Sequence, residues 1–164
     1  MVPYRLIERP SFFVTGQKTW ISGPDNSLFG RFWQTCRAGG LFEQFERING
    51  LKPGPQTGAT TLGISRVEAD PAVREFYYMI AVEVANSTPA DDLEIYQVPA
   101  CTWAVFECRG QVPESIVTAE IFAFTQWLPS SGCIHAHAPE MEVYLPETGQ
   151  PDYFCEFWLP VCKK

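Results

Sequence analysis

The sequence predicts an α+β fold made of two strand–helix–strand–strand repeats, in which helices pack on an antiparallel sheet. Three observations support this prediction. Hydrophobic residues make up 46% and charged residues 19% of the chain, as in a globular protein. Segments with alternating apolar residues are separated by segments with apolar residues at helical spacing. The order of these segments in the first half returns in the second, with Pro10 and Pro99 before equivalent strands.

The first half begins with an extended segment in which Pro10 precedes a β-prone run, and the turn Gly23–Ser27 follows. Apolar side chains then recur at helical spacing, and Gly39 and Gly40 interrupt the helix before it resumes. In chain order, the expected elements are an extended segment over 4–21, helices over 28–36 and 41–48, and strands over 60–67 and 76–84.

The second half repeats this order after a loop over 86–92 that is rich in turn residues. Pro129 is expected to end its helix, because proline interrupts helical hydrogen bonding. The expected elements are an extended segment over 93–108, a helix over 115–128, and strands over 141–145 and 153–161.

We interpret residues 1–164 as one domain, with repeat one at about 1–86 and repeat two at about 92–164. A unit of that size buries too little surface to be stable alone, so the two repeats are expected to share a core. Ligand clefts tend to form at such seams.

The net charge and the aromatic content of the chain limit the classes of function to be considered. The formal net charge is −7, which argues against binding to nucleic acid or to an anionic membrane surface. An acidic chain instead concentrates cations around itself. Aromatic residues reach 14%, including five tryptophans, and a ligand pocket would use the surplus that the core does not need.

The cysteines and the N-terminal segment point to a reduced, cytoplasmic protein. No C-x-x-C pair occurs, and most cysteines lie in apolar patterns where the thiol acts as a small hydrophobe. No apolar signal region opens the chain, and no apolar run approaches the length of a membrane span. The six cysteines are Cys36, Cys101, Cys108, Cys133, Cys155 and Cys162.

The most informative segment is the strand expected at 141–145. Its odd-numbered residues are apolar and should face the core, so Glu142 and Tyr144 share the other face. That face either meets water or lines a cleft. No Arg or Lys lies within four residues of Glu142. Because a desolvated carboxylate needs a partner and aromatic rings attract cations, the cleft interpretation predicts an apolar cationic ligand.

Four other aromatic residues are candidate walls of the same site, and each is also a candidate for the core: Tyr78, Trp158, Trp33 and Trp103. His135 and His137 lack the nearby ligands of a metal site, so no metal is expected. No phosphate-binding, dinucleotide-binding or hydrolase motif occurs, and no cofactor is expected.

The chain resembles the GyrI-like small-molecule binding domain, which also serves as the effector-binding domain of AraC-type and MerR-type multidrug regulators. The matching motifs cover nearly the whole chain: ERPSFFVTG, FGRFWQTC, LFEQF, FYYMIAVEV, VPACTWAVFECRG, WLPSSG, MEVYLP and EFWLPV. The resemblance implies pseudo-twofold symmetry between the repeats, a ligand cleft between them and a pocket glutamate at Glu142. It implies aromatic walls at Tyr78, Tyr144 and Trp158, and less directly at Trp33 and Trp103.

Three functions are compatible with this resemblance. The first is a standalone sensor or sequestering module for hydrophobic cationic drugs or dyes, with no direct contact to nucleic acid or membrane. The second is a hydrolase of cyclopropane-bearing toxins that uses Glu142 as a general base. The third is a ligand-linked partner of a transcription or gyrase complex. Because no second acid or nucleophile is evident, binding is expected rather than catalysis.

Overall fold

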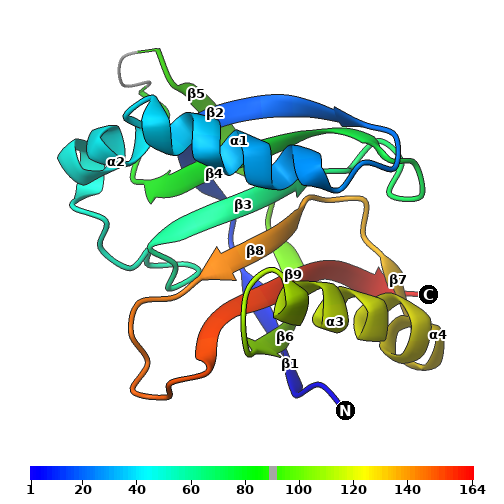
Figure 1. The fold of residues 1–164 in the computed structure, drawn as a ribbon. Helices are drawn as coiled ribbons and strands as arrows, with labels where there is room; N and C mark the ends of the chain where they lie inside the picture. Colours follow the sequence, from blue (N-terminus) through cyan, green and yellow to red (C-terminus); the bar gives the residue numbers. More distant parts are fainter. Residues whose placement is uncertain (89–91) are drawn as a thin grey trace.

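The protein is described by a computed structural model that covers residues 1–88 and 92–164. The described elements confirm the α+β class: a nine-stranded antiparallel sheet carries helices on one side (Figure 1). In chain order they are β1 (Tyr4–Arg9), β2 (Phe12–Ser22), α1 (Ser27–Ala38), α2 (Leu41–Asn49), β3 (Thr61–Arg66), β4 (Glu75–Val84), β5 (Glu94–Val98), β6 (Cys101–Arg109), α3 (Glu114–Phe122), η1 (Ala123–Trp127), α4 (Leu128–Ser130), β7 (Cys133–His135), β8 (Glu140–Tyr144) and β9 (Tyr153–Lys163).

The sheet has the order β1-β6-β9-β8-β3-β4-β2-β5, and β7 pairs with β9 outside this path. The first strand of each half pairs with the other half: β1 pairs with β6, and β5 pairs with β2. β3 and β8 form the central pair, where the two halves meet. The exchange of β1 and β5 joins the halves through backbone hydrogen bonds on both sides of this centre.

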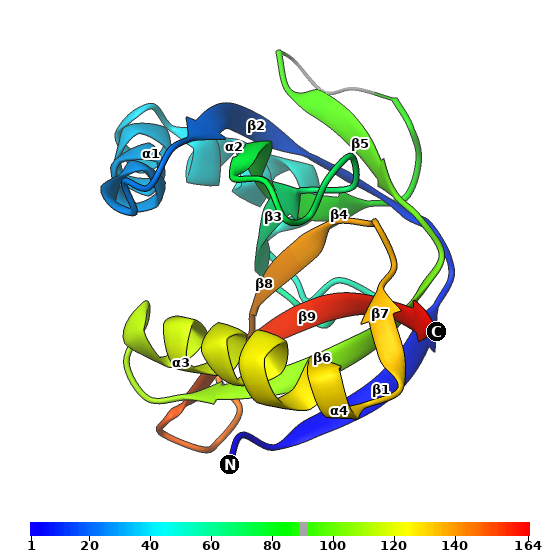
Figure 2. The same cartoon turned by 90° about the vertical axis from the view of Figure 1, so that its right-hand side faces the viewer.

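The two faces of the curved sheet carry different cores. One face holds a cluster to which both halves contribute, including Val14, Ile64, Met141 and Trp158. The other face is covered by α1 and α2 over the first half and by α3 over the second. Figure 2 shows these helices on the same side of the sheet, with a gap between α1 and α3 at the level of β3 and β8. The helices therefore flank the central strand pair.

The structure differs from the sequence prediction at two places in the second half. The helix does not stop at Pro129, because the π-helical turn η1 follows α3 and a new α-helical turn begins at Leu128. Proline is tolerated in the first turn of a helix, where its missing N–H has no partner to lose. The short strand β7 was not predicted.

The expected midpoint loop over 86–92 includes residues 89–91, which lie outside the described residues. No helix in the described part of the chain is long and apolar enough to cross a membrane.

Candidate ligand-binding site

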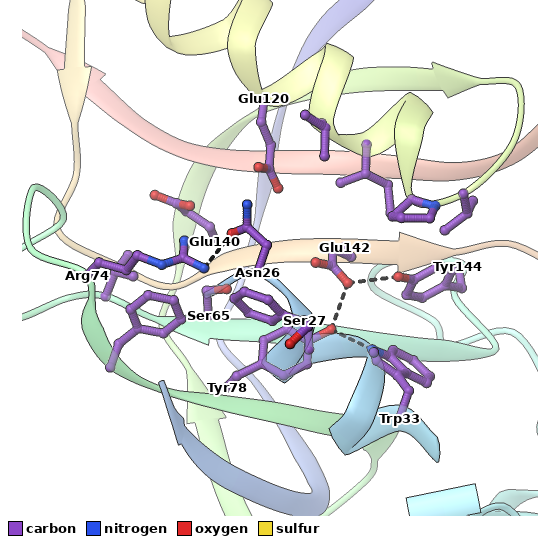
Figure 3. A pocket seen from close by; sticks show the side chains of 18 of the residues that line it. Asn26, Ser27, Trp33, Ser65, Arg74, Tyr78, Glu120, Glu140, Glu142 and Tyr144 are labelled. Carbon is purple, nitrogen blue, oxygen red and sulfur yellow. Dashed lines mark hydrogen bonds between the residues drawn. The ribbon is translucent and has the colours of Figure 1, made fainter. Parts of the chain in front are cut away.

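A cleft of about 1210 Å³ lies between the helices of the two halves. α1 forms one wall, α3 forms the other, and side chains of β3, β4 and β8 form the floor. Figure 3 shows most of the residues that line it, with Glu120 projecting from α3 and Glu142 and Tyr144 from β8. The central strand pair thus places the residues of the expected seam at the bottom of a real cavity.

Glu142 is the centre of a hydrogen-bond network on this floor. The hydroxyl groups of Tyr78 and Tyr144 both donate to Glu142 Oε1, at 2.7 and 2.8 Å. The indole N–H of Trp33 donates to the Tyr78 oxygen at 2.9 Å. Three elements, α1, β4 and β8, therefore fix the position of one carboxylate oxygen. The second oxygen, Oε2, makes no hydrogen bond with the described residues and is available to a ligand.

Burial raises the pKa of Glu142, and the two hydrogen bonds from Tyr78 and Tyr144 partly oppose that rise. Burial and the nearby carboxylate raise the pKa of both tyrosines, so these remain phenols and act as donors. The carboxyl group therefore ionises at a higher pH than an ordinary glutamate. A cation in the cleft would favour ionisation and recover part of the desolvation cost.

Aromatic rings surround this carboxylate on the α1 side. Trp33 meets Tyr144 edge to face at a centroid distance of 5.2 Å, and Phe29 meets Tyr78 in the same way at 4.9 Å. Phe42 of α2 stacks against Trp33 at 6.0 Å. A cation held by Glu142 would lie beside these rings, and cation–π attraction would add to the charge interaction.

Gly63 is a site residue that sequence reasoning missed. It lies opposite Glu142 in the β3–β8 register and is buried. A Cβ atom at this position would be within 2.5 Å of Glu142 Oε1 and would overlap the Tyr78 hydroxyl. The space above the Gly63 backbone is thus where Tyr78 reaches Glu142. A glycine inside an apolar strand is the only sequence signal of such a close approach.

We expect Gly63→Ala to break the Tyr78–Glu142 hydrogen bond. Overpacking of a filled site should lower the free energy of unfolding by about 2 kcal/mol, and affinity for a cationic ligand should fall by roughly tenfold. Urea denaturation and a ligand titration measure the two effects. Gly30→Ala is the matched control, because Gly30 also lines the cleft but an added Cβ would meet no atom within 4 Å. Equal binding by the two variants would contradict the role of Gly63.

Glu120 is a second residue that sequence reasoning did not select. It lies between Ala119 and Ile121 in the sequence, and the structure shows it on the α3 wall of the cleft. Burial, together with the charges of Glu142 and Glu140, raises the pKa of Glu120 to about 8. Glu140 also lines the cleft, and its Oε2 lies 3.0 Å from His135 Nε2. The cleft is therefore more acidic than its single predicted carboxylate implied.

Trp158 and Trp103 do not reach the cleft. Trp158 pairs with Met141 across β8 and β9, so it lies on the face opposite Glu142, and Phe157 is the residue that pairs with Glu142. Trp103 is fully buried on the same face as Trp158, with ring centroids 5.7 Å apart.

Of the six predicted residues, the structure brings four together: Glu142, Tyr144, Tyr78 and Trp33. Strand register, which alternation alone does not determine, separates the other two.

His135 and His137 lie next to each other, but the described residues contain no group of three or more His, Cys, Asp or Glu side chains arranged for a metal ion. Nε2 of His135 faces Glu140, and its Nδ1 accepts the backbone N–H of His137. His135 of β7 therefore contacts both the loop before β8 and the first residue of β8. All six cysteines are free thiols in the structure.

A comparison with known families finds a match that covers nearly the whole chain. The family model described as the GyrI-like small molecule binding domain matches residues 3–161. The chain belongs to the GyrI-like family. Small-molecule binding is therefore its general function, and the cleft between α1 and α3 is the candidate place for it.

Proteins similar to this GyrI-like domain include a transcriptional regulator and a ligand complex. The transcriptional regulator BrlR of Pseudomonas aeruginosa is 28% identical over 111 residues, which are 67% of this chain and 36% of BrlR, so the match spans about a third of that protein. The structure of SAV2435 bound to tetraphenylphosphonium has a TM-score of 0.78 at 24% identity, covering 98% of this chain and 94% of SAV2435. The C-terminal domain of EcmrR has a TM-score of 0.65 at 15% identity, covering 100% and 99%. The two structures share the fold.

Proposed function

We propose that this GyrI-like domain binds bulky aromatic cations in the cleft, with Glu142 as the counter-ion. The observation that carries the proposal is the arrangement of its two carboxylate oxygens. Oε1 is held by Tyr78 and Tyr144, while Oε2 has no partner among the described residues. A half-buried carboxyl group with one open oxygen is stabilised in its ionised form by a positive partner from outside.

The surroundings of Glu142 support a ligand that is both apolar and charged. Trp33, Phe29 and Phe42 offer aromatic surface on one wall, and α3 offers Ile116, Val117 and other apolar side chains on the opposite wall.

The two arginines of the cleft do not neutralise Glu142, because no ion pair joins it to either of them. Their guanidinium groups lie over aromatic rings instead: Arg37 over Phe42 and Arg74 over Phe29.

The family relationship supports the same class of ligand. The related structure of SAV2435 contains tetraphenylphosphonium, an aromatic cation of the kind that this cleft should accept. BrlR is a transcriptional regulator, and we propose that ligand binding by this chain acts as a sensing or sequestering step against such compounds. The biological readout then depends on the partner that detects the occupied state.

The decisive experiment compares two ions of nearly equal shape and opposite charge. Isothermal titration calorimetry at pH 8.5 should detect binding of tetraphenylphosphonium and at least about a hundredfold weaker binding of tetraphenylborate, because the anion would face an unpaired carboxylate. Equal affinities would show that the cleft selects only apolar shape, and the counter-ion role of Glu142 would then be rejected. Triphenylphosphine oxide, a neutral relative, should bind with intermediate affinity.

A further inference from the structure

A second carboxylate faces the cleft from the wall opposite the Glu142 network. Glu120 belongs to α3, where Ile116 and Val117 line the same wall, and Phe124 of η1 extends it. Figure 3 shows its side chain pointing from the helix toward the β8 floor, on which Glu142 lies. The two carboxylates therefore come from different elements and approach the cavity from different sides.

Glu120 has no partner within the described residues. Its carboxylate is half-buried, and neither a hydrogen bond nor an ion pair stabilises its charge. Arg74 is the cation near enough to lower the pKa of Glu120. However, its guanidinium donates to the Gly23 carbonyl and to Asn26 Oδ1. Glu120 is therefore an acidic position without a partner, and a cation placed beside it would favour its ionised form.

The carboxyl groups of the cleft repel one another when they are ionised, and a bound cation reduces this repulsion. The charges of Glu142 and Glu140 both raise the pKa of Glu120, which adds to the effect of its burial. A ligand that carries one positive charge relieves this repulsion at one carboxylate only. A second positive charge placed near Glu120 would relieve it at the other.

The size of the cleft is compatible with such a ligand. Its volume is about 1210 Å³, whereas pockets for drug-sized ligands span roughly 300–1,000 Å³. The apolar side chains of α3 around Glu120 can cover an extended hydrocarbon body, while the rings of α1 cover the other end. The room and the surface thus extend beyond what a single compact cation at Glu142 would occupy.

We propose that the cleft selects aromatic compounds with two cationic centres, one held at Glu142 and the second held at Glu120. This inference rests on the proposed function, since it assumes that Glu142 binds the first charge. Glu120 is then the residue that sets the preference for dications over monocations. Its position on α3 determines how far apart the two cationic centres of the ligand must be.

Ethidium and propidium test this proposal, because they share one phenanthridinium ring system and propidium adds a quaternary ammonium on a short alkyl arm. Fluorescence titration of the wild-type protein at pH 8.5, above the pKa of Glu120, should show about tenfold tighter binding of propidium. Glu120→Gln should reduce that preference to about twofold or less while changing ethidium affinity by no more than about threefold. Glu114→Gln is the matched control, since it removes one charge from an exposed position of α3 outside the cleft.

The outcomes separate this proposal from the proposed function. If wild-type protein binds both dyes equally, or if Glu120→Gln and Glu114→Gln reduce the preference to the same extent, the second cationic position is rejected and Glu142 keeps its role. If neither dye binds, or if Glu142→Gln leaves ethidium affinity unchanged, the proposed function fails. Thermal unfolding of each variant without dye shows that the comparison is made between folded proteins.

Discussion

Glu142→Gln should weaken tetraphenylphosphonium binding by roughly thirtyfold, equivalent to about 2 kcal/mol, when measured by calorimetry at pH 8.5. Glutamine keeps the size of the side chain and leaves an oxygen that can accept from Tyr78 and Tyr144, so the network and the fold should persist. What is lost is the negative charge at the open oxygen. The affinity for triphenylphosphine oxide should change little, because that ligand carries no net charge.

The pH dependence of the same binding reaction gives an independent check. Burial raises the pKa of Glu142, and a cation binds the ionised form, so wild-type affinity should rise as the pH increases through that pKa and then level off. Glu142→Gln should remove this part of the rise. The part due to Glu120 should remain but move to lower pH, because the charge of Glu142 is one of the causes that raise the pKa of Glu120.

Two results would contradict this role of Glu142. One is a pH profile of the variant that matches the wild-type profile. The other is an equal loss of affinity in Glu43→Gln, which removes one charge from an exposed position of α2 that does not line the cleft. The second result would assign the effect to the overall negative charge of the protein.

The order of elements could be predicted because each depends on nearby residues. The alternation around Glu142 predicted which side chains of β8 share a face, and the structure places Glu142 and Tyr144 together in the cleft. Helical spacing likewise predicted α1, which carries Trp33. Tyr78 could be assigned only to pocket or core, and it belongs to both, since its ring is buried and its hydroxyl reaches Glu142.

The remaining features depend on contacts between distant segments. The exchange of β1 and β5 between the halves joins residues that no local pattern relates, such as Ile7 and Trp103. The β8–β9 register decides that Phe157 rather than Trp158 lies opposite Glu142. Gly63 matters only because Tyr78 and Glu142 converge above it. A sequence pattern identifies the face of each strand, but the pairing between strands determines which residues meet.

Trp158→Ala should lower the free energy of unfolding by about 4 kcal/mol, which urea denaturation without ligand can measure. Trp158 is 1% exposed and packs with Trp103 in the core shared by both halves. Its indole N–H also donates to Glu156, a buried carboxylate that accepts a hydrogen bond from Arg5 as well. Truncation would therefore leave a large cavity and remove one donor from a buried charge.

Trp158→Phe distinguishes a core role from a pocket role, since it keeps most of the packing and should remain folded with a loss of about 1–2 kcal/mol. Because the β8–β9 register places this side chain on the face opposite Glu142, affinity for tetraphenylphosphonium should stay within about twofold of wild type. Trp33→Phe, by contrast, removes the N–H that holds the Tyr78 hydroxyl, and it should weaken binding several-fold with a smaller effect on stability. A reversal of this pattern would mean that the ligand lies against the shared core and that the cleft between α1 and α3 is not its site.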